Sequence, residues 1–186
     1  MNIGALREVA SILNRVKVPY AVTGGVAAVY YDVPRMTFDV DILISSLETS
    51  QTEKLAKLLV EKDPSLKAGS VRRTLKEGGI IRVNWGDVTV VDFVIKKEVG
   101  LILERAIEAE GIKIVSLEDL VLQKLSVICA APRGTIRFQD REDVEVLLAI
   151  HRGDLDIDYL KEEAKKAGTA SLLSRFLGKA FRRKKL

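Results

Sequence analysis

Two aspartates that stand two residues apart in an apolar segment are the first candidates for chemistry in this chain. In the stretch DVDILI, Asp39 and Asp41 alternate with Val40 and Ile42. Side chains two apart on a β-strand point to the same face, so the two carboxylates are expected to project together, about 6.5–7 Å apart along the strand. Paired carboxylates repel each other unless a proton or a cation lies between them, and Mg²⁺ prefers oxygen ligands. The alternative is a pair of solvent-facing aspartates on an edge strand.

A third carboxylate stands alone in a second apolar segment, VTVVDFVI, where Asp92 is surrounded by valines, a phenylalanine and an isoleucine. A buried aspartate is costly unless a cation or a hydrogen-bond donor lies beside it. If this strand lies next to the strand that carries Asp39 and Asp41, three carboxylates meet at one point. That arrangement suits two metal ions and an in-line phosphoryl transfer.

Two adjacent glycines, Gly24 and Gly25, separate a predicted strand, YAVT, from a predicted short helix, VAAVYY. Glycines let the backbone approach a ligand closely, and backbone N–H groups at the start of a helix favour phosphate oxygens. The alternative for this pair is a plain tight turn.

In this order and spacing, the motifs resemble those of the DNA polymerase β-like nucleotidyltransferase superfamily. Gly24-Gly25 is followed by thirteen residues and then by Asp39-Val40-Asp41, and Asp92 is similar to the third metal-site carboxylate of that superfamily. The stretch PRMTFDVDILI is similar to small stand-alone bacterial and archaeal members, some of them toxin–antitoxin or abortive-infection proteins. SLEDLVLQKLSV and RFQDREDVEVLL resemble two later helical motifs of those proteins, so the resemblance covers roughly residues 20–150.

The resemblance implies a Mg²⁺-dependent nucleotidyltransferase, which moves a nucleoside monophosphate from an NTP such as ATP to an acceptor hydroxyl and releases pyrophosphate. Asp39 and Asp41 would hold Mg²⁺, while Asp92 would complete a second metal site and help to deprotonate the acceptor. Gly24 and Gly25 would cradle the β- and γ-phosphates.

Five further residues have a role only through the same resemblance. Arg35 and Thr37, just before the metal strand, could bind phosphate or simply anchor the loop. Lys124 lies on the helix that faces the triphosphate in related proteins, and its alternative is a solvated lysine. Asp140 and Asp143 could join the site, or could be a helix N-cap and a first-turn acid.

One departure from the family pattern concerns the first motif, where many members have Gly-Ser and this chain has Gly-Gly. The change removes a serine hydroxyl that contacts phosphate. The acceptor is left open between RNA such as tRNA, a protein and a small molecule, and an antitoxin partner is conceivable. A catalytically silent relative that binds nucleotide or serves as an interaction module is the main alternative.

The elements expected to position these residues form an α+β fold. A small mixed sheet with flanking helices is expected over residues 1–115, and a helical region that completes the cleft over 116–186. The strands IIRVNW and VTVVDFVI are expected to form a hairpin about Gly86-Asp87. The stretch VRRTLKEGG before it is interpreted as a solvated basic loop, and the alternative is a contact with an RNA acceptor or a nucleotide. Residues 98–115 are ambiguous between a helix and a second hairpin about Glu110-Gly111.

The composition is that of a globular protein. Of 186 residues, 47% are hydrophobic and 30% are charged, and no apolar run approaches the roughly 20 residues that span a bilayer. The single cysteine, Cys129, excludes an internal disulfide, fits a reducing cytoplasm and is expected in the core. A net charge of +4 is compatible with a nucleotide partner, and also with a nucleic-acid-binding protein whose aspartates are incidental.

Overall fold

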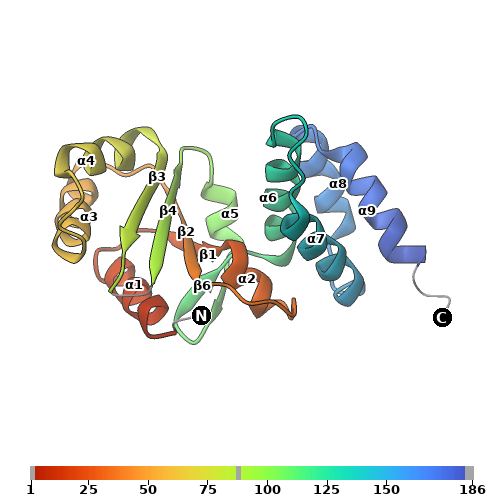
Figure 1. Ribbon diagram of the computed structural model, residues 1–186, viewed down its shortest axis with the longest axis horizontal. Helices are drawn as coiled ribbons and strands as arrows, with labels where there is room; N and C mark the ends of the chain where they lie inside the picture. Colours follow the sequence, from red (N-terminus) through yellow and green to blue (C-terminus); the bar gives the residue numbers. More distant parts are fainter. Residues whose placement is uncertain (1–2, 87–88, 183–186) are drawn as a thin grey trace. The chain divides into compact units, whose positions relative to one another are not determined.

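The computed structural model describes residues 3–86 and 89–182, and these residues form two compact units (Figure 1). The first unit comprises the chain up to Ala27 together with Met36–Val115, and the second comprises Ala28–Arg35 together with the chain from Ser116 onward. The first unit holds a mixed β-sheet with helices, and the second is helical. The predicted α+β fold class is confirmed.

The sheet of the first unit has the strand order β3-β4-β2-β1-β6-β5 in the described residues. Parallel pairs (β4 with β2, β1 with β6) alternate with antiparallel pairs (β3 with β4, β2 with β1, β6 with β5). The strands are β1 Tyr20–Thr23, β2 Asp39–Ser45, β3 Gly79–Asn84, β4 Val90–Lys96, β5 Ile107–Ala109 and β6 Ile112–Ile114. The strand that carries Asp39 and Asp41 is therefore flanked on both sides, and it is not an edge strand.

Burial along the two central strands follows the apolar pattern of the sequence. Ile42 and Ile44 of β2 and Phe93 of β4 are all buried in the core, whereas Asp39 at the start of β2 is exposed. An isoleucine or phenylalanine contributes roughly 1.5–3 kcal/mol when it is fully buried. These side chains fix the strand register, because a shift by one residue would turn them to the opposite face.

Four described helices belong wholly to the first unit: α1 Ile3–Arg15, α3 Thr49–Lys62, α4 Ala68–Glu77 and α5 Gly100–Glu104. Helix α1 contacts β6, while α3 and α4 pack against each other and against β3 (Figure 1). Asp63 ties the end of α3 to β3, since its Oδ2 accepts hydrogen bonds from the backbone N–H and the side chain of Asn84, at 2.8 and 2.9 Å. A hydrogen bond from the Ser65 hydroxyl, together with those from Asn84, holds the pKa of Asp63 below its ordinary value.

Helix α4 replaces the basic loop that the sequence was expected to form. Val71 and Leu75 stand four residues apart and are both buried, which gives the segment one apolar helical face. Arg72 lies on the outer face and donates from Nε to Glu53 of α3 at 2.8 Å. The helix was not predicted, because its short apolar face stands among many charged residues in the sequence.

The ambiguous segment after β4 contains both of its alternatives, a short helix and then a hairpin. Helix α5 ends at Glu104, and the turn between β5 and β6 is made by Glu110 and Gly111, which have φ of 51° and 76°. Two successive residues with positive φ are typical of a two-residue hairpin turn. At the first predicted hairpin, β3 pairs with β4 as expected, but Asp87 lies outside the described residues.

The second unit is built from α6 Leu117–Ala130, α7 Phe138–Ile150, α8 Ile157–Lys166 and α9 Ala170–Arg182, together with the end of α2 (Gly24–Tyr30). Ser116 caps α6, accepting a hydrogen bond from the backbone N–H of Asp119 at 3.2 Å. Helix α7 packs against α6 and α9, and α8 also contacts both. Cys129, expected in the core, is exposed near the end of α6, so that prediction is wrong.

Candidate active site

The carboxylates of β2 and β4 lie in register at the centre of the sheet. Asp41 is paired directly with Asp92 across the parallel β2–β4 ladder, and Asp39 is paired with Val90. Adjacent strands lie about 4.8 Å apart, and paired residues of neighbouring strands point to the same face. The two strands that carry the aspartates are therefore adjacent, as considered from the sequence, and Asp92 is buried.

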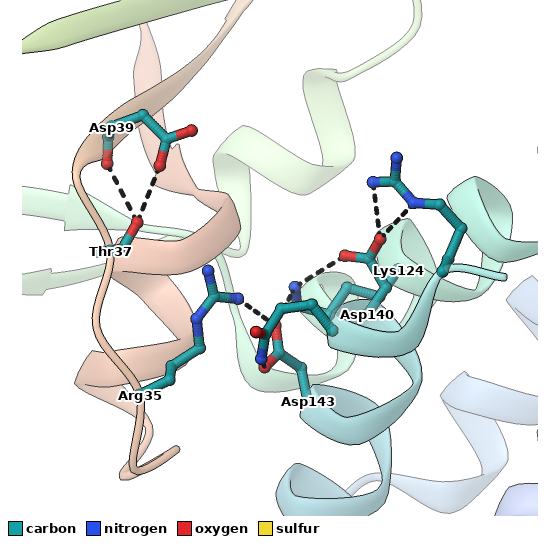
Figure 2. A network of polar contacts seen from close by, with 8 residues as sticks. Arg35, Thr37, Asp39, Lys124, Asp140 and Asp143 are labelled. Atoms are coloured by element: carbon teal, nitrogen blue, oxygen red, sulfur yellow. Dashed lines mark hydrogen bonds and ion pairs between the residues drawn. The ribbon is translucent and has the colours of Figure 1, made fainter.

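Thr37 orients the first of these carboxylates. Its hydroxyl donates to Asp39 Oδ1 at 2.8 Å, as Figure 2 shows, and Thr37 itself is buried. Of the two roles left open for this threonine, the contact favours anchoring: it holds the loop before β2 against the side chain that begins the strand.

Gly24 leaves room for the second carboxylate. It is the first residue of α2 and has φ of 63°, a conformation that other residues adopt only with strain. A Cβ at this position would lie 2.7 Å from Cγ of Asp41 and closer still to its Oδ2. The backbone at Gly24 and the carboxylate of Asp41 are thus in direct contact, and only glycine fits. Gly25, the next residue of α2, is buried.

Arg82 is the immediate partner of the third carboxylate. It lies opposite Asp92 in the antiparallel β3–β4 pair, and donates from Nε to Oδ1 at 2.9 Å and from Nη2 to Oδ2 at 2.7 Å. A two-pronged arginine–carboxylate pair is among the stronger polar contacts in proteins. The hydrogen bonds and charge of Asp92, with the charges of Asp39 and Asp41, raise the pKa of Arg82 above its ordinary value.

The three aspartates offer the type of oxygen ligand that Mg²⁺ prefers. All the donors are carboxylates, Asp41 and Asp92 are adjacent, and Gly24 makes room for one of them. Within residues 3–86 and 89–182, however, no three acidic, histidine or cysteine side chains are gathered closely enough to hold a cation. Thr37 and Arg82 hold two of the three carboxylates in their present orientations.

Four of the remaining predicted residues meet in the second unit, around the buried carboxylate of Asp143 (Figure 2). Arg35 Nη1 and Lys124 Nζ each lie 2.6 Å from Asp143 Oδ2, and Lys124 Nζ lies 3.3 Å from Asp140 Oδ1. Gln139 donates to Asp143 Oδ1 at 3.1 Å. We call these five side chains the Asp143 network.

The Asp143 network answers several of the alternatives that the sequence left open. Lys124 is not a solvated lysine, because its side chain is 6% exposed and paired with two carboxylates. Asp140 lies in the first turn of α7, and the N-cap is Arg137, so neither aspartate is the N-cap. Arg137 instead pairs with Asp140 at 2.7 Å. The network joins α6, α7 and the segment Ala28–Arg35 of the second unit.

Comparisons with known proteins identify solved structures with a similar fold. No protein-family model and no curated protein matches the chain. Among solved structures, it is similar to an antigenic nucleotidyltransferase-like protein from Paracoccidioides brasiliensis, with 16% identity, a TM-score of 0.54 and coverage of 94% of this chain and 91% of that one. This chain has a nucleotidyltransferase fold.

Two structures of ANT(2″)-Ia support the same nucleotidyltransferase fold. A crystal structure in complex with adenylyl-2″-tobramycin has 12% identity, a TM-score of 0.56 and coverage of 94% and 98%. A solution structure, described as an antibiotic-resistance factor, has 13% identity, a TM-score of 0.55 and coverage of 97% and 96%. At these identities the likeness shows the fold alone.

Arg82 is a residue of the candidate site that the sequence patterns did not predict. It is the one charged residue in the apolar strand IIRV, which is the same pattern that drew attention to Asp92. Two opposite charges, one in each strand of a predicted hairpin, are candidates for a cross-strand pair. The sequence does not give the length of the turn, however, and without it the strand register that pairs Arg82 with Asp92 could not be predicted.

Proposed function

We propose that this protein is a Mg²⁺-dependent nucleotidyltransferase whose metal ligands are Asp39, Asp41 and Asp92. The observation that carries the proposal is the pairing of Asp41 with Asp92 on adjacent central strands, with Gly24 pressed against Asp41. The nucleotidyltransferase fold supports it, as does the order of these residues along the chain, which resembles the motif order of that superfamily.

The proposed reaction transfers a nucleoside monophosphate. The oxygen of an acceptor hydroxyl attacks the α-phosphorus of an NTP, the bond from that phosphorus to the bridging oxygen breaks, and pyrophosphate leaves. Asp39, Asp41 and Asp92 would hold Mg²⁺, which would supply positive charge to the phosphates and the reacting oxygens. Asp92, a carboxylate in an otherwise apolar strand, accepts the hydroxyl proton, and Thr37 keeps Asp39 oriented through its hydroxyl.

The residues proposed to contact the nucleotide are two glycines and two cations. Gly24 and Gly25 begin helix α2, with Gly24 against Asp41, and the backbone N–H groups at the start of a helix suit the β- and γ-phosphates. Arg35 and Lys124 supply positive charge, but both are already paired with Asp143. We therefore assign these two cations first to holding the Asp143 network together, and to phosphate binding only if a nucleotide displaces part of that network.

The acceptor is proposed to be a hydroxyl on a small molecule, an RNA or a protein. ANT(2″)-Ia, which shares the fold, was crystallised with adenylyl-2″-tobramycin. A small polyhydroxylated acceptor is therefore the first class to test, with tRNA and protein acceptors after it. A toxin role with an antitoxin partner in the cytoplasm remains part of the proposal on the basis of the sequence resemblance.

Thermal unfolding with each of the four NTPs, with and without Mg²⁺, tests the proposal without knowledge of the acceptor. At about 100 times the Kd, a ligand stabilises the native state by about 2.7 kcal/mol. For a chain of 186 residues this raises Tm by roughly 5–11 °C. The rise should need Mg²⁺, and it should disappear in Asp39→Asn.

Two results would count against a nucleotidyltransferase. The absence of any shift with all four NTPs would favour a catalytically silent relative. That second candidate is supported by the Gly-Gly motif and by Arg82, which takes up both oxygens of Asp92. A shift that is the same in Asp39→Asn as in the wild type would place NTP binding elsewhere on the chain.

A further inference from the structure

We propose that Arg82 is a built-in counter-cation for Asp92 and competes with a divalent metal ion for that carboxylate. The inference rests on the proposed function, because it assumes that Asp92 is a metal ligand. Arg82 would then be a positioning residue, which sets how tightly the site binds metal before a nucleotide arrives.

The contact uses both oxygens of the carboxylate. Nε of Arg82 lies 2.9 Å from Oδ1 of Asp92, and Nη2 lies 2.7 Å from Oδ2. A metal ion needs at least one of these oxygens, so it must share the carboxylate with the guanidinium or displace it. The competition follows from the geometry, whatever the identity of the divalent ion.

Strand register places Arg82 and the proposed metal site on opposite sides of Asp92. Asp92 faces Arg82 across the antiparallel β3–β4 pair and faces Asp41 across the parallel β2–β4 pair. A cation between Asp41 and Asp92 would meet the guanidinium across a single carboxylate. Two positive charges on one carboxylate repel each other, so each weakens the binding of the other.

The two partners differ in how easily they can leave the contact. The side chain of Asp92 is 10% exposed, whereas that of Arg82 is 70% exposed. Asp92 therefore cannot turn to water, and without a cation it would be a costly buried charge. Arg82 can swing outward and be hydrated without leaving a cavity. It is suited to neutralise Asp92 when no metal is bound and to withdraw when one binds.

Binding of Mn²⁺ in the absence of nucleotide tests this role, read from the electron paramagnetic resonance signal of free Mn²⁺. Arg82→Gln removes the competing charge and should tighten Mn²⁺ binding by about tenfold, as expected for the loss of one charge-assisted contact. Arg82→Lys keeps the charge but loses the two-pronged geometry, so its affinity should lie between those of Arg82→Gln and the wild type.

Arg72→Gln is the matched control, since Arg72 is also on the first unit and paired with a carboxylate, that of Glu53. It should bind Mn²⁺ as the wild type does. Equal affinities in wild type, Arg82→Gln and Arg82→Lys, with binding lost in Asp41→Asn, would overturn the role of Arg82 and leave the proposed function intact. Absence of Mn²⁺ binding in the wild type and every variant would overturn the proposed function and this inference with it.

Discussion

At the scale of single residues, the candidate site consists of carboxylates that each have an assigned neighbour. Asp39 accepts from Thr37, Asp41 lies against Gly24, and Asp92 is held by Arg82. The aspartates and glycines could be found from the sequence because charge and glycine are conspicuous in apolar segments. Thr37 was named, but its role was left open, because a hydroxyl gives no periodic signal. The contact of Arg82 with Asp92 could not be predicted, because it depends on the register of the β3–β4 hairpin and the sequence does not specify the length of its turn.

Gly24→Ala tests the contact between backbone and carboxylate. The new methyl group would overlap Asp41, and the residue would have to keep a φ of 63°. Overpacking and a left-handed backbone together should cost roughly 2–4 kcal/mol, which chemical denaturation can measure. Mg²⁺-dependent NTP binding should also be lost, because Asp41 must move.

Gly69→Ala is the control for Gly24→Ala. Gly69 lies in helix α4, and nothing lies within 4 Å of the Cβ it would gain. Alanine should stabilise that helix slightly, by up to about 1 kcal/mol. If Gly24→Ala were as stable as Gly69→Ala and bound NTP normally, the contact between Gly24 and Asp41 would not be needed for stability or for NTP binding.

At the scale of elements, the long periodic segments could be predicted and the short ones could not. The strands β2 and β4 lie close to where their apolar patterns placed them, and the helices α6, α7, α8 and α9 lie within residues 116–186, which were expected to be helical. Helix α4 was missed because only Val71 and Leu75 mark its buried face. Residues 98–115 contain a helix of five residues and two strands of three, too short for any periodicity to distinguish them.

The Asp143 network is the feature that joins elements in the second unit, and Asp143→Asn tests it. The side chain of Asp143 is fully buried, and its replacement leaves Lys124 and Arg35 without their shared carboxylate. Breaking a buried pair on one side typically costs 3–5 kcal/mol. Since Asp140 still contacts Lys124, we expect about 3 kcal/mol and a fall in Tm of roughly 6–12 °C by circular dichroism.

Glu145→Gln provides the comparison on the same helix. Glu145 pairs with Lys179, whose side chain is 66% exposed, and exposed pairs contribute little to stability. Its Tm should therefore change by no more than about 2 °C. Equal Tm values for Asp143→Asn and Glu145→Gln would mean that the network does not stabilise the second unit.

At the scale of the whole molecule, the order of the motifs predicted the fold class before any contact was known. A strand, two glycines, an aspartate strand and a later aspartate strand were expected to lie in a mixed sheet, and the sheet of the first unit is mixed. Residues 28–35 were expected with the sheet, yet they group with the C-terminal helices. The reason is the Asp143 network and the contact of His151 Nε2 with the carbonyl oxygen of Tyr31 at 3.0 Å, both of which join residues more than 100 positions apart.

Among the described residues, no helix is long and apolar enough to cross a membrane.

The alkaline limit of stability should depend on two tyrosines, one in each unit. Burial raises the pKa of Tyr20, and burial with the neighbouring charges raises that of Tyr31. A group whose pKa is higher in the folded state contributes stability that is complete below its unfolded pKa, near 10, and is lost as the pH rises above it. Between pH 10 and 11, Tyr31 should therefore cost the wild type about 1 kcal/mol, or roughly 2–4 °C in Tm.

Tyr31→Phe cannot ionise and should lose less stability than the wild type between pH 10 and 11 when Tm is followed from pH 7 upward. The neighbouring Tyr30 supplies the control, because its side chain is exposed and its ring contacts that of Tyr31 edge to face. Tyr30→Phe should follow the wild-type curve. If the Tyr31→Phe curve instead coincided with those of wild type and Tyr30→Phe, ionisation of Tyr31 would not be linked to unfolding. The alkaline limit would then be set by Tyr20 and Lys166, whose pKa values are also raised in the folded state.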